Sequence, residues 1–238
     1  VTAVTDARNN SVSYGYNSAT RQQSSVTDAN GNQSSYSYGN AANMLRLASL
    51  TSDGTGTVSY GYDAYGKLNA ITRGGTVYGF TYDLWNRIVD TKVGSTALST
   101  NAYDQYGRLS SVSYGNGFMT VYTYDSLDRV SAISQRTSAN GSSTLCYAFV
   151  YNNEGDLYEL RNYKTLRASF FEYDHAGRCM ASTEKSFTVT NGEISYAAQV
   201  SAYSYEYDAL NRLSKLSCTM AGTSYDTVLY VRDPGCAG

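Results

Sequence analysis

The sequence is poor in charge, proline and long apolar runs, and each shortage excludes a class of protein. Charged residues make up 16% of the 238 residues and the formal net charge is −2. A chain with so little positive charge lacks the basic surface that binds nucleic acid or an anionic membrane. No apolar run approaches the length of a membrane span. We therefore expect no nucleic-acid partner and no membrane span in this segment.

Cysteine and histidine are also scarce, which bears on catalysis and metal binding. The four cysteines, Cys146, Cys179, Cys218 and Cys236, show no CxxC or Cys/His ligand spacing, so they predict free, mostly packed thiols rather than a disulfide framework. His175 is the only histidine, and no Ser or Cys nucleophile lies in a recognisable turn. We interpret His175 as an exposed turn residue and predict no enzyme activity, cofactor or metal site.

The residues that are abundant favour strands and tight turns. Tyrosine contributes 25 residues and glycine 21, and the remaining polarity comes largely from Ser, Thr and Asn. Tyrosine and threonine are enriched in β-strands, whereas glycine and asparagine are typical of turns. No segment shows convincing helical periodicity with caps. The composition therefore predicts an all-β chain.

One short sequence recurs along the whole chain. It is clearest from Tyr103 to Val112, YDQYGRLSSV, and nine units begin near Tyr16, Tyr38, Tyr62, Tyr82, Tyr103, Tyr124, Tyr151, Tyr173 and Tyr207. A residue that recurs in many repeats is better explained as scaffold than as active site. We interpret the recurring residues as a structural repeat signature. It comprises Tyr62, Asp63, Gly66, Tyr82, Asp83, Tyr103, Asp104, Gly107, Arg108, Tyr124, Asp125, Tyr173, Asp174, Gly177, Tyr207 and Asp208.

Each unit has the pattern of a β-hairpin. A second aromatic precedes most of the repeat tyrosines by two residues, as in Tyr122/Tyr124, and this spacing places both rings on one face of a strand. The following Asp-x-x-Gly or Asp-x-x-Asn predicts a turn that Asp opens by capping backbone N–H groups and Gly or Asn closes with positive φ. An Arg or Lys followed by Leu, Ile or Val then starts the return strand, as in Arg108-Leu109.

Second turns join one unit to the next. They are predicted at Asp53-Gly54, Gly74-Gly75, Asn116-Gly117, Asn140-Gly141 and Asn191-Gly192. Together the turns predict an antiparallel meander of roughly eighteen strands, with extended outer hairpins in the long gaps after Tyr124 and Tyr173, including Phe187 to Tyr196.

Contacts between units are expected to stabilise the array, because a single hairpin is marginal in water. We predict that the aromatic pairs of neighbouring units stack, and that Arg108 and its equivalents fold over aromatic faces or bond to the Asp of the same or the next hairpin. Leu109 and Val112 are three residues apart and would face opposite sides of a regular strand. Either a bulge reunites them or both faces of the sheet are partly covered.

The repeat resembles the YD repeats of Rhs proteins, which also occur in the C component of bacterial Tc toxins and in teneurins. The resemblance rests on the Tyr-Asp-x-x-Gly-Arg-Leu core, the Val26 to Asn32 lead-in VTDANGN and the doubled aromatic, and it covers essentially the whole chain. It implies hairpins wound into a curved or spiralling β-sheet strip, part of a hollow shell. Residues 1–238 are then a single repeat array and a fragment of a longer repeat region, because the Val4 lead-in already belongs to a repeat.

The resemblance implies two functions of different class. In the bacterial members the shell encloses a toxic C-terminal polypeptide for delivery, so the neighbouring repeats of the full-length shell and an enclosed toxin are the expected partners. In teneurins the shell is a cell-surface adhesion domain, and an adhesion or carbohydrate-binding module is the alternative. Either implies a secreted or cell-surface protein. Asp233-Pro234 lacks the arginine- and tyrosine-rich context of the bacterial self-cleavage region, so we interpret it as a repeat lead-in.

Overall fold

The structure is a computed structural model that describes residues 2–41, 44–138, 140–220 and 223–228. Its regular elements in these ranges are twenty β-strands, so the predicted all-β fold is confirmed. None of the described residues forms a helix able to span a membrane. The roughly eighteen predicted strands correspond to the two strands of each of nine units, and the additional strands lie before the first unit and after the last.

The chain divides into two compact units, which we call unit 1 (Val1–Phe118) and unit 2 (Met119–Gly238). Unit 1 contains β1 (Ala3–Thr5), β2 (Ser11–Tyr16), β3 (Gln23–Thr27), β4 (Gln33–Ala41), β5 (Met44–Ser52), β6 (Gly56–Tyr62), β7 (Leu68–Arg73), β8 (Thr76–Tyr82), β9 (Ile88–Val93), β10 (Thr96–Tyr103) and β11 (Leu109–Tyr114). Unit 2 contains β12 (Met119–Tyr124), β13 (Val130–Arg136), β14 (Thr144–Tyr151), β15 (Leu157–Asn162), β16 (Arg167–Tyr173), β17 (Cys179–Thr190), β18 (Glu193–Tyr207), β19 (Leu213–Met220) and β20 (Thr223–Val228).

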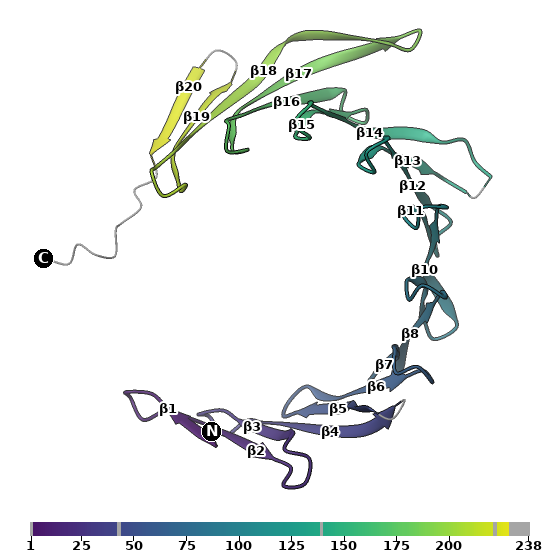
Figure 1. The fold of residues 1–238 in the computed structure, drawn as a ribbon, viewed down its shortest axis with the longest axis vertical. Helices are drawn as coiled ribbons and strands as arrows, with labels where there is room; N and C mark the ends of the chain where they lie inside the picture. The colour runs from purple at the N-terminus through teal and green to yellow at the C-terminus, as the bar shows by residue number, and fades with distance from the viewer. Residues whose placement is uncertain (1, 42–43, 139, 221–222, 229–238) are drawn as a thin grey trace, which may run out of the picture. The chain divides into compact units, whose positions relative to one another are not determined.

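Within each unit every strand pairs antiparallel with the next strand along the chain, as a meander does. Figure 1 shows each unit, taken by itself, as a curved strip with strands in one layer over most of its length. That all of residues 1–238 form a single array stays a prediction. The repeat tyrosines end the first strand of each hairpin, from Tyr16 in β2 to Tyr207 in β18, except that β4 continues beyond Tyr38 to Ala41.

A β-bulge in each hairpin decides which side chains share a face. The strand register shifts immediately before every repeat tyrosine, so that Ala102 pairs with Ser111 while Tyr103 pairs with Leu109. Ser110 is therefore the extra residue of the return strand. The bulge brings Leu109 opposite Tyr103 and Val112 opposite Asn101, on one face of the sheet. Of the two alternatives left open by the sequence, the structure shows the bulge.

The turns between units follow the sequence closely, with one difference in the long gaps. Gly74 and Gly75 both have positive φ, as do Asn191 and Gly192, which is the geometry of a two-residue hairpin turn. The predicted outer hairpin after Tyr173 is confirmed by β17 and β18. After Tyr124, however, β13 ends at Arg136 and β14 begins at Thr144, so the additional residues join the strands instead of lengthening them.

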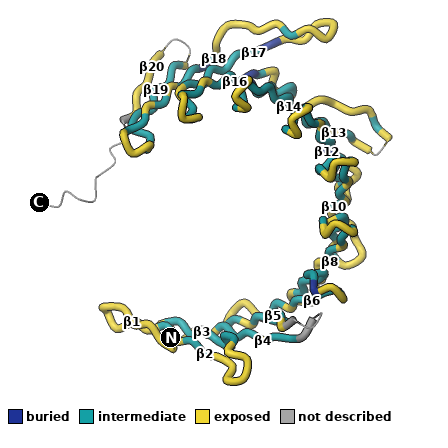
Figure 2. Tube along the Cα trace, viewed as in Figure 1, coloured by how far each residue is buried: buried dark blue, intermediate teal, exposed yellow. Residues whose placement is uncertain are grey.

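A single layer of strands leaves little to bury. Figure 2 shows half-buried strands and exposed turns along both units. The fully buried apolar side chains among the described residues are Cys146, Ala168 and Phe187, all in unit 2. Cys146, Cys179 and Cys218 are free thiols, as predicted, and Cys236 lies outside the described residues. Contacts between neighbouring hairpins must therefore supply much of the stability.

Candidate functional site

The repeat aspartates build the same turn in every unit that carries them. In the turn after Tyr103, the Asp104 carboxylate accepts hydrogen bonds from the N–H groups of Tyr106 and Arg108, both 2.9 Å. The backbone closes the turn, because the Gly107 N–H donates to the Asp104 carbonyl at 2.9 Å and Gly107 has φ of 83°. The same geometry occurs at Asp63, Asp83, Asp125, Asp174 and Asp208. The predicted role of Asp as a turn cap agrees with these contacts.

Each of these carboxylates, except that of Asp63, also holds the arginine four residues later. Arg87 Nε donates to Asp83 Oδ2 at 2.7 Å, and Arg87 Nη2 lies 2.6 Å from the same oxygen. Partial burial alone would raise the pKa of the Asp83 carboxyl. Hydrogen bonds from the Arg87 backbone and side chain outweigh that effect and hold the pKa below its ordinary value. The ion pair therefore fixes the direction in which the guanidinium points.

The guanidinium points at the tyrosine of the next hairpin. Arg87 lies 4.0 Å from the centre of the Tyr103 ring, a distance at which the ring face attracts a cation. The same arrangement joins Arg46 to Tyr62, Lys67 to Tyr82, Arg129 to Tyr151 and Arg178 to Tyr207. Both contacts predicted for the repeat arginines are thus present, one to the Asp of the same hairpin and one to an aromatic face.

The ring-on-ring stacking predicted from the aromatic pairs is wrong for these tyrosines. A cation of the preceding hairpin covers the ring of Tyr62, Tyr82, Tyr103, Tyr151 and Tyr207. The reason is the register of the sheet, which inserts the return strand of one unit between the tyrosines of that unit and the next. The cation just before that strand, as Arg87 is before β9, reaches the ring.

The tyrosine hydroxyl completes the contact between hairpins. Tyr103 Oη donates to the Ile88 carbonyl at 2.8 Å, and Ile88 directly follows Arg87 in the sequence. Corresponding bonds reach Leu47, Leu68, Val130, Leu157 and Cys179 from the tyrosine of the following unit. We call the combination of cation, ring, hydroxyl and carbonyl the inter-hairpin lock. The cation of one unit and the residue that follows it, such as Arg87 and Ile88, thereby bind the tyrosine of the next unit.

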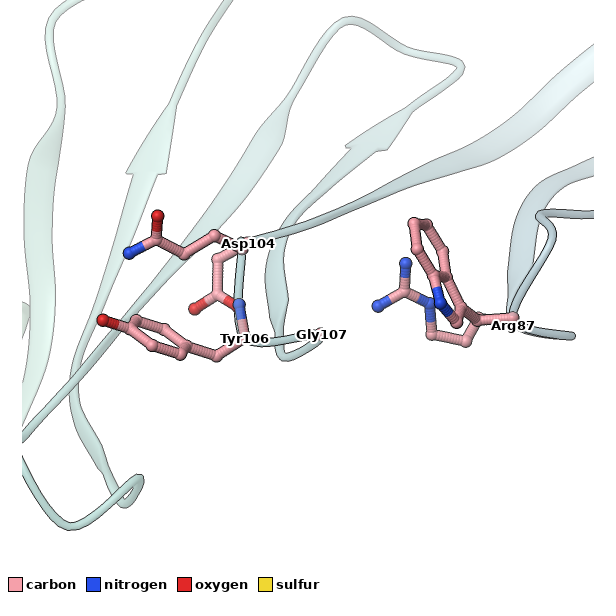
Figure 3. A pocket seen from close by; sticks show the side chains of 6 residues that line it. Arg87, Asp104, Tyr106 and Gly107 are labelled. Atoms are coloured by element: carbon pink, nitrogen blue, oxygen red, sulfur yellow. The ribbon is translucent and has the colours of Figure 1, made fainter.

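The variable turn positions form a row of exposed apolar side chains that the sequence did not single out. Tyr65, Trp85 and Tyr106 occupy the third position of consecutive turns and are 71–78% exposed. Between two such turns lies a groove of about 430 Å³, lined by Trp85 and Arg87 on one side and Asp104 to Gly107 on the other. Figure 3 shows Arg87 facing the turn that carries Asp104, Tyr106 and Gly107.

A polar and aromatic cluster in unit 2 was also missed by sequence reasoning. Glu159 is buried on β15 and accepts hydrogen bonds from Arg161 and from the Tyr196 hydroxyl of the long β17–β18 hairpin. Burial, followed by the bond to Glu159, raises the pKa of Tyr196. Phe187 packs edge-on against Tyr163, at 5.3 Å between ring centres. Residues 37 positions apart make this cluster, so no local pattern announces it.

The histidine considered for catalysis and metal binding lies apart from the lock. His175 is exposed on its turn, as expected. Within the described ranges, no group of three or more His, Cys, Asp or Glu is placed to hold a metal ion. The Asp233-Pro234 pair lies outside the described residues. The geometry is that of repeated hairpins joined by repeated locks.

Comparisons with known proteins lead to one architecture. A family model described as teneurin YD-shell matches residues 3–134, more than half of the chain. The crystal structure of TcdB2-TccC3-Cdc42 is similar, with a TM-score of 0.59 at 13% identity, and the match covers 95% of this chain and 16% of that one. The crystal structure of TcdB2-TccC3 without its hypervariable C-terminal region is also similar, with a TM-score of 0.59 at 14% identity. That match covers 92% of this chain and 15% of the other chain. At these identities the likeness shows the fold alone. A search of curated protein sequences found no match.

Proposed function

The chain belongs to the teneurin YD-shell family, and we propose that it is a length of shell wall whose array encloses a C-terminal toxin or effector polypeptide for delivery. It spans about 16% of the length of the TcdB2-TccC3-Cdc42 chain that it resembles. We also propose that residues 1–238 belong to one longer repeat array. The whole protein would then be secreted or displayed at the cell surface.

The inter-hairpin lock is the observation that carries this proposal. The tyrosine of one unit is bound by the cation of the unit before it and by the carbonyl of the residue after that cation. Arg87 and Ile88 bind Tyr103 in this way, and Arg129 and Val130 bind Tyr151. Each hairpin thus carries a tyrosine on one side and a cation with its carbonyl on the other, so any number of such hairpins can be joined by the same contact. The thin layer supports a role as a wall, because a wall separates two sides without needing a core of its own.

The repeat tyrosines also favour a structural role over adhesion. In most units the tyrosine hydroxyl and ring are engaged by the preceding hairpin, as at Tyr103, so they are not available to stack on a sugar. Replacing Tyr122 and Tyr124 together by alanine is therefore expected to unfold the surrounding hairpins. Retained folding with lost glycan binding would instead favour the adhesion module. Circular dichroism and a glycan-binding assay on the same protein separate the two results.

Protease protection tests the enclosure itself. In the full-length protein the C-terminal polypeptide should resist a soluble protease while the array is folded and should be cut once urea unfolds the array. The same polypeptide expressed without the array is the matched control and should be cut at once. Equal cleavage of the two in native buffer would show that the array does not enclose it.

A further inference from the structure

One junction in unit 2 departs from the lock described above. The unit that begins at Tyr151 reads YNNEGDLYEL, so Asn152 replaces the usual Asp and Asp156 replaces the usual Arg or Lys. The next tyrosine, Tyr173, therefore faces an acidic residue where Tyr62, Tyr82, Tyr103, Tyr151 and Tyr207 face a cation. At position 156 a negative side chain therefore replaces the positive one of the other units, and not a neutral one.

The backbone around this position is unchanged. Asn152 caps its turn as the aspartates do, since its side-chain oxygen accepts the Asp156 N–H at 2.8 Å and its N–H donates to the Asp156 carbonyl at 2.9 Å. Tyr173 Oη still donates to the Leu157 carbonyl at 3.0 Å. The Tyr173 hydroxyl and the Leu157 carbonyl are thus held as in the other junctions, but within the described part of the chain no cation covers the Tyr173 ring.

A groove of about 410 Å³ lies at this junction. Its lining includes four carboxylates, those of Glu154, Asp156, Glu172 and Asp174, and the imidazole of His175, but no Lys or Arg. Asp174 is paired with Arg178, whereas no ion pair joins the other three within the residues that the structure describes. The Tyr173 and Tyr158 side chains also line the groove, so negative charge and aromatic surface meet there. Burial raises the pKa of Tyr173, and the charges of Cys179 and Asp156 add to that effect.

We propose that this groove binds an arginine side chain supplied by another polypeptide, which takes the place that a lock cation occupies in the other junctions. The occupied junctions define the chemistry of the occupant. A guanidinium lies 4.0–5.5 Å from the tyrosine ring in four of them and an ammonium in one. The three carboxylates without an ion-pair partner provide the complementary charge. An organic cation fits a site of rings and carboxylates better than a metal ion does.

This inference is independent of what the array encloses, because it concerns only which side chain the groove accepts. A basic segment of an enclosed polypeptide and a basic segment of an external partner would both supply the arginine. The guanidinium would approach through the exposed side of the groove, where Glu154 and Glu172 are solvent-accessible. Planar, bidentate pairing with a carboxylate then favours arginine over lysine.

The test is an NMR titration with the peptide acetyl-Gly-Arg-Gly-amide, with the matched peptide carrying citrulline, a neutral isostere of arginine, as control. We expect saturable shifts for the arginine peptide, centred on the Tyr173 ring and weakened by salt, and none for the citrulline peptide. Asp156→Asn should weaken binding about fivefold, the scale of one exposed ion pair. Glu193→Gln, an exposed acid on β18 outside the groove lining, should not change it.

A charge reversal gives a second readout. Asp156→Arg restores the cation that the other junctions carry over the tyrosine, so it should abolish peptide binding and also raise the urea midpoint of unfolding. Undiminished binding by Asp156→Arg, or equal binding of the citrulline peptide, would overturn the proposal. If Asp156→Arg does not fold, Asp156→Asn combined with Glu172→Gln replaces it, and unchanged affinity in that variant would overturn the proposal equally.

Discussion

Replacing Arg87 is the most direct test of the inter-hairpin lock. Arg87→Ala removes the ion pair with Asp83 and the contacts with two aromatic rings, Tyr103 at 4.0 Å and Trp85 at 5.0 Å. A partly exposed ion pair contributes up to about 1 kcal/mol. A cation–ring contact contributes about 0.5–1 kcal/mol at an exposed site. We therefore expect the free energy of unfolding to fall by about 1–3 kcal/mol.

The assay is urea unfolding followed by two signals. Far-UV circular dichroism reports the sheet, while the fluorescence of Trp85, the only tryptophan, reports the affected turn. Coincidence of the two transitions would show that the hairpins unfold together, and only then does the midpoint give a single free energy. The turn itself should persist, because Asp83 still caps the N–H groups of residues 85 and 87.

Two further variants make the result decisive. Arg87→Lys keeps a cation near the ring but loses the two-nitrogen contact with Asp83, so its loss should be intermediate. Leu84→Ala changes a neighbouring side chain that is 98% exposed and should leave stability within about 0.5 kcal/mol. If Arg87→Ala is as stable as Leu84→Ala, the lock contributes nothing and the reasoning is wrong.

Three other predictions follow from the same contacts. Lys67→Arg should raise the free energy of unfolding of unit 1 by up to about 1 kcal/mol in urea, because the Asp63 carboxylate has no ion-pair partner among the described residues. If stability does not rise, the contact between an arginine and the turn carboxylate contributes nothing to it. Phe187→Ala should destabilise unit 2 by about 3 kcal/mol through the cavity it leaves, and a loss below 1 kcal/mol would mean that the long hairpin is not packed there. The hydrogen bond from the Arg178 side chain holds the pKa of Asp174 below its ordinary value of 3.8. The stability this gives is present above pH 3.8 and lost as the pH falls through the lowered pKa, so Asp174→Asn should flatten the acid limb of the stability profile.

The sequence predicted the hairpin accurately because all of its determinants are local. The Asp104 turn depends on contacts within four residues, and the side chains that make them are visible as Asp-x-x-Gly-Arg. The pairing of the strands follows from the turn within each unit, the turn between units, and the alternation of side chains between the two faces of a strand. The resemblance to YD repeats led to the correct family for the same reason, since the repeat is a local pattern found many times.

The error concerned contacts between hairpins. The spacing of Tyr122 and Tyr124 places both rings on one face, and that is compatible with rings stacked on rings or with rings stacked on arginines. The choice depends on which side chain at the start of the intervening return strand, or just before it, reaches the ring, and the bulge before each tyrosine sets that register. The cluster of Glu159, Arg161 and Tyr196 was missed because its members come from separate strands.

By itself, the sequence determined a chain of antiparallel hairpins whose Asp cap, positive-φ turn and return strand all lie within about ten residues. The tertiary structure decided how those hairpins hold each other, with Arg87 over Tyr103 and the Tyr103 hydroxyl on the Ile88 carbonyl. It also identified the junction where Asp156 faces Tyr173 across an acidic groove. The physical reason is the separation of the contacting residues along the chain. Turn contacts join residues within four positions of each other, whereas the lock joins residues of neighbouring hairpins.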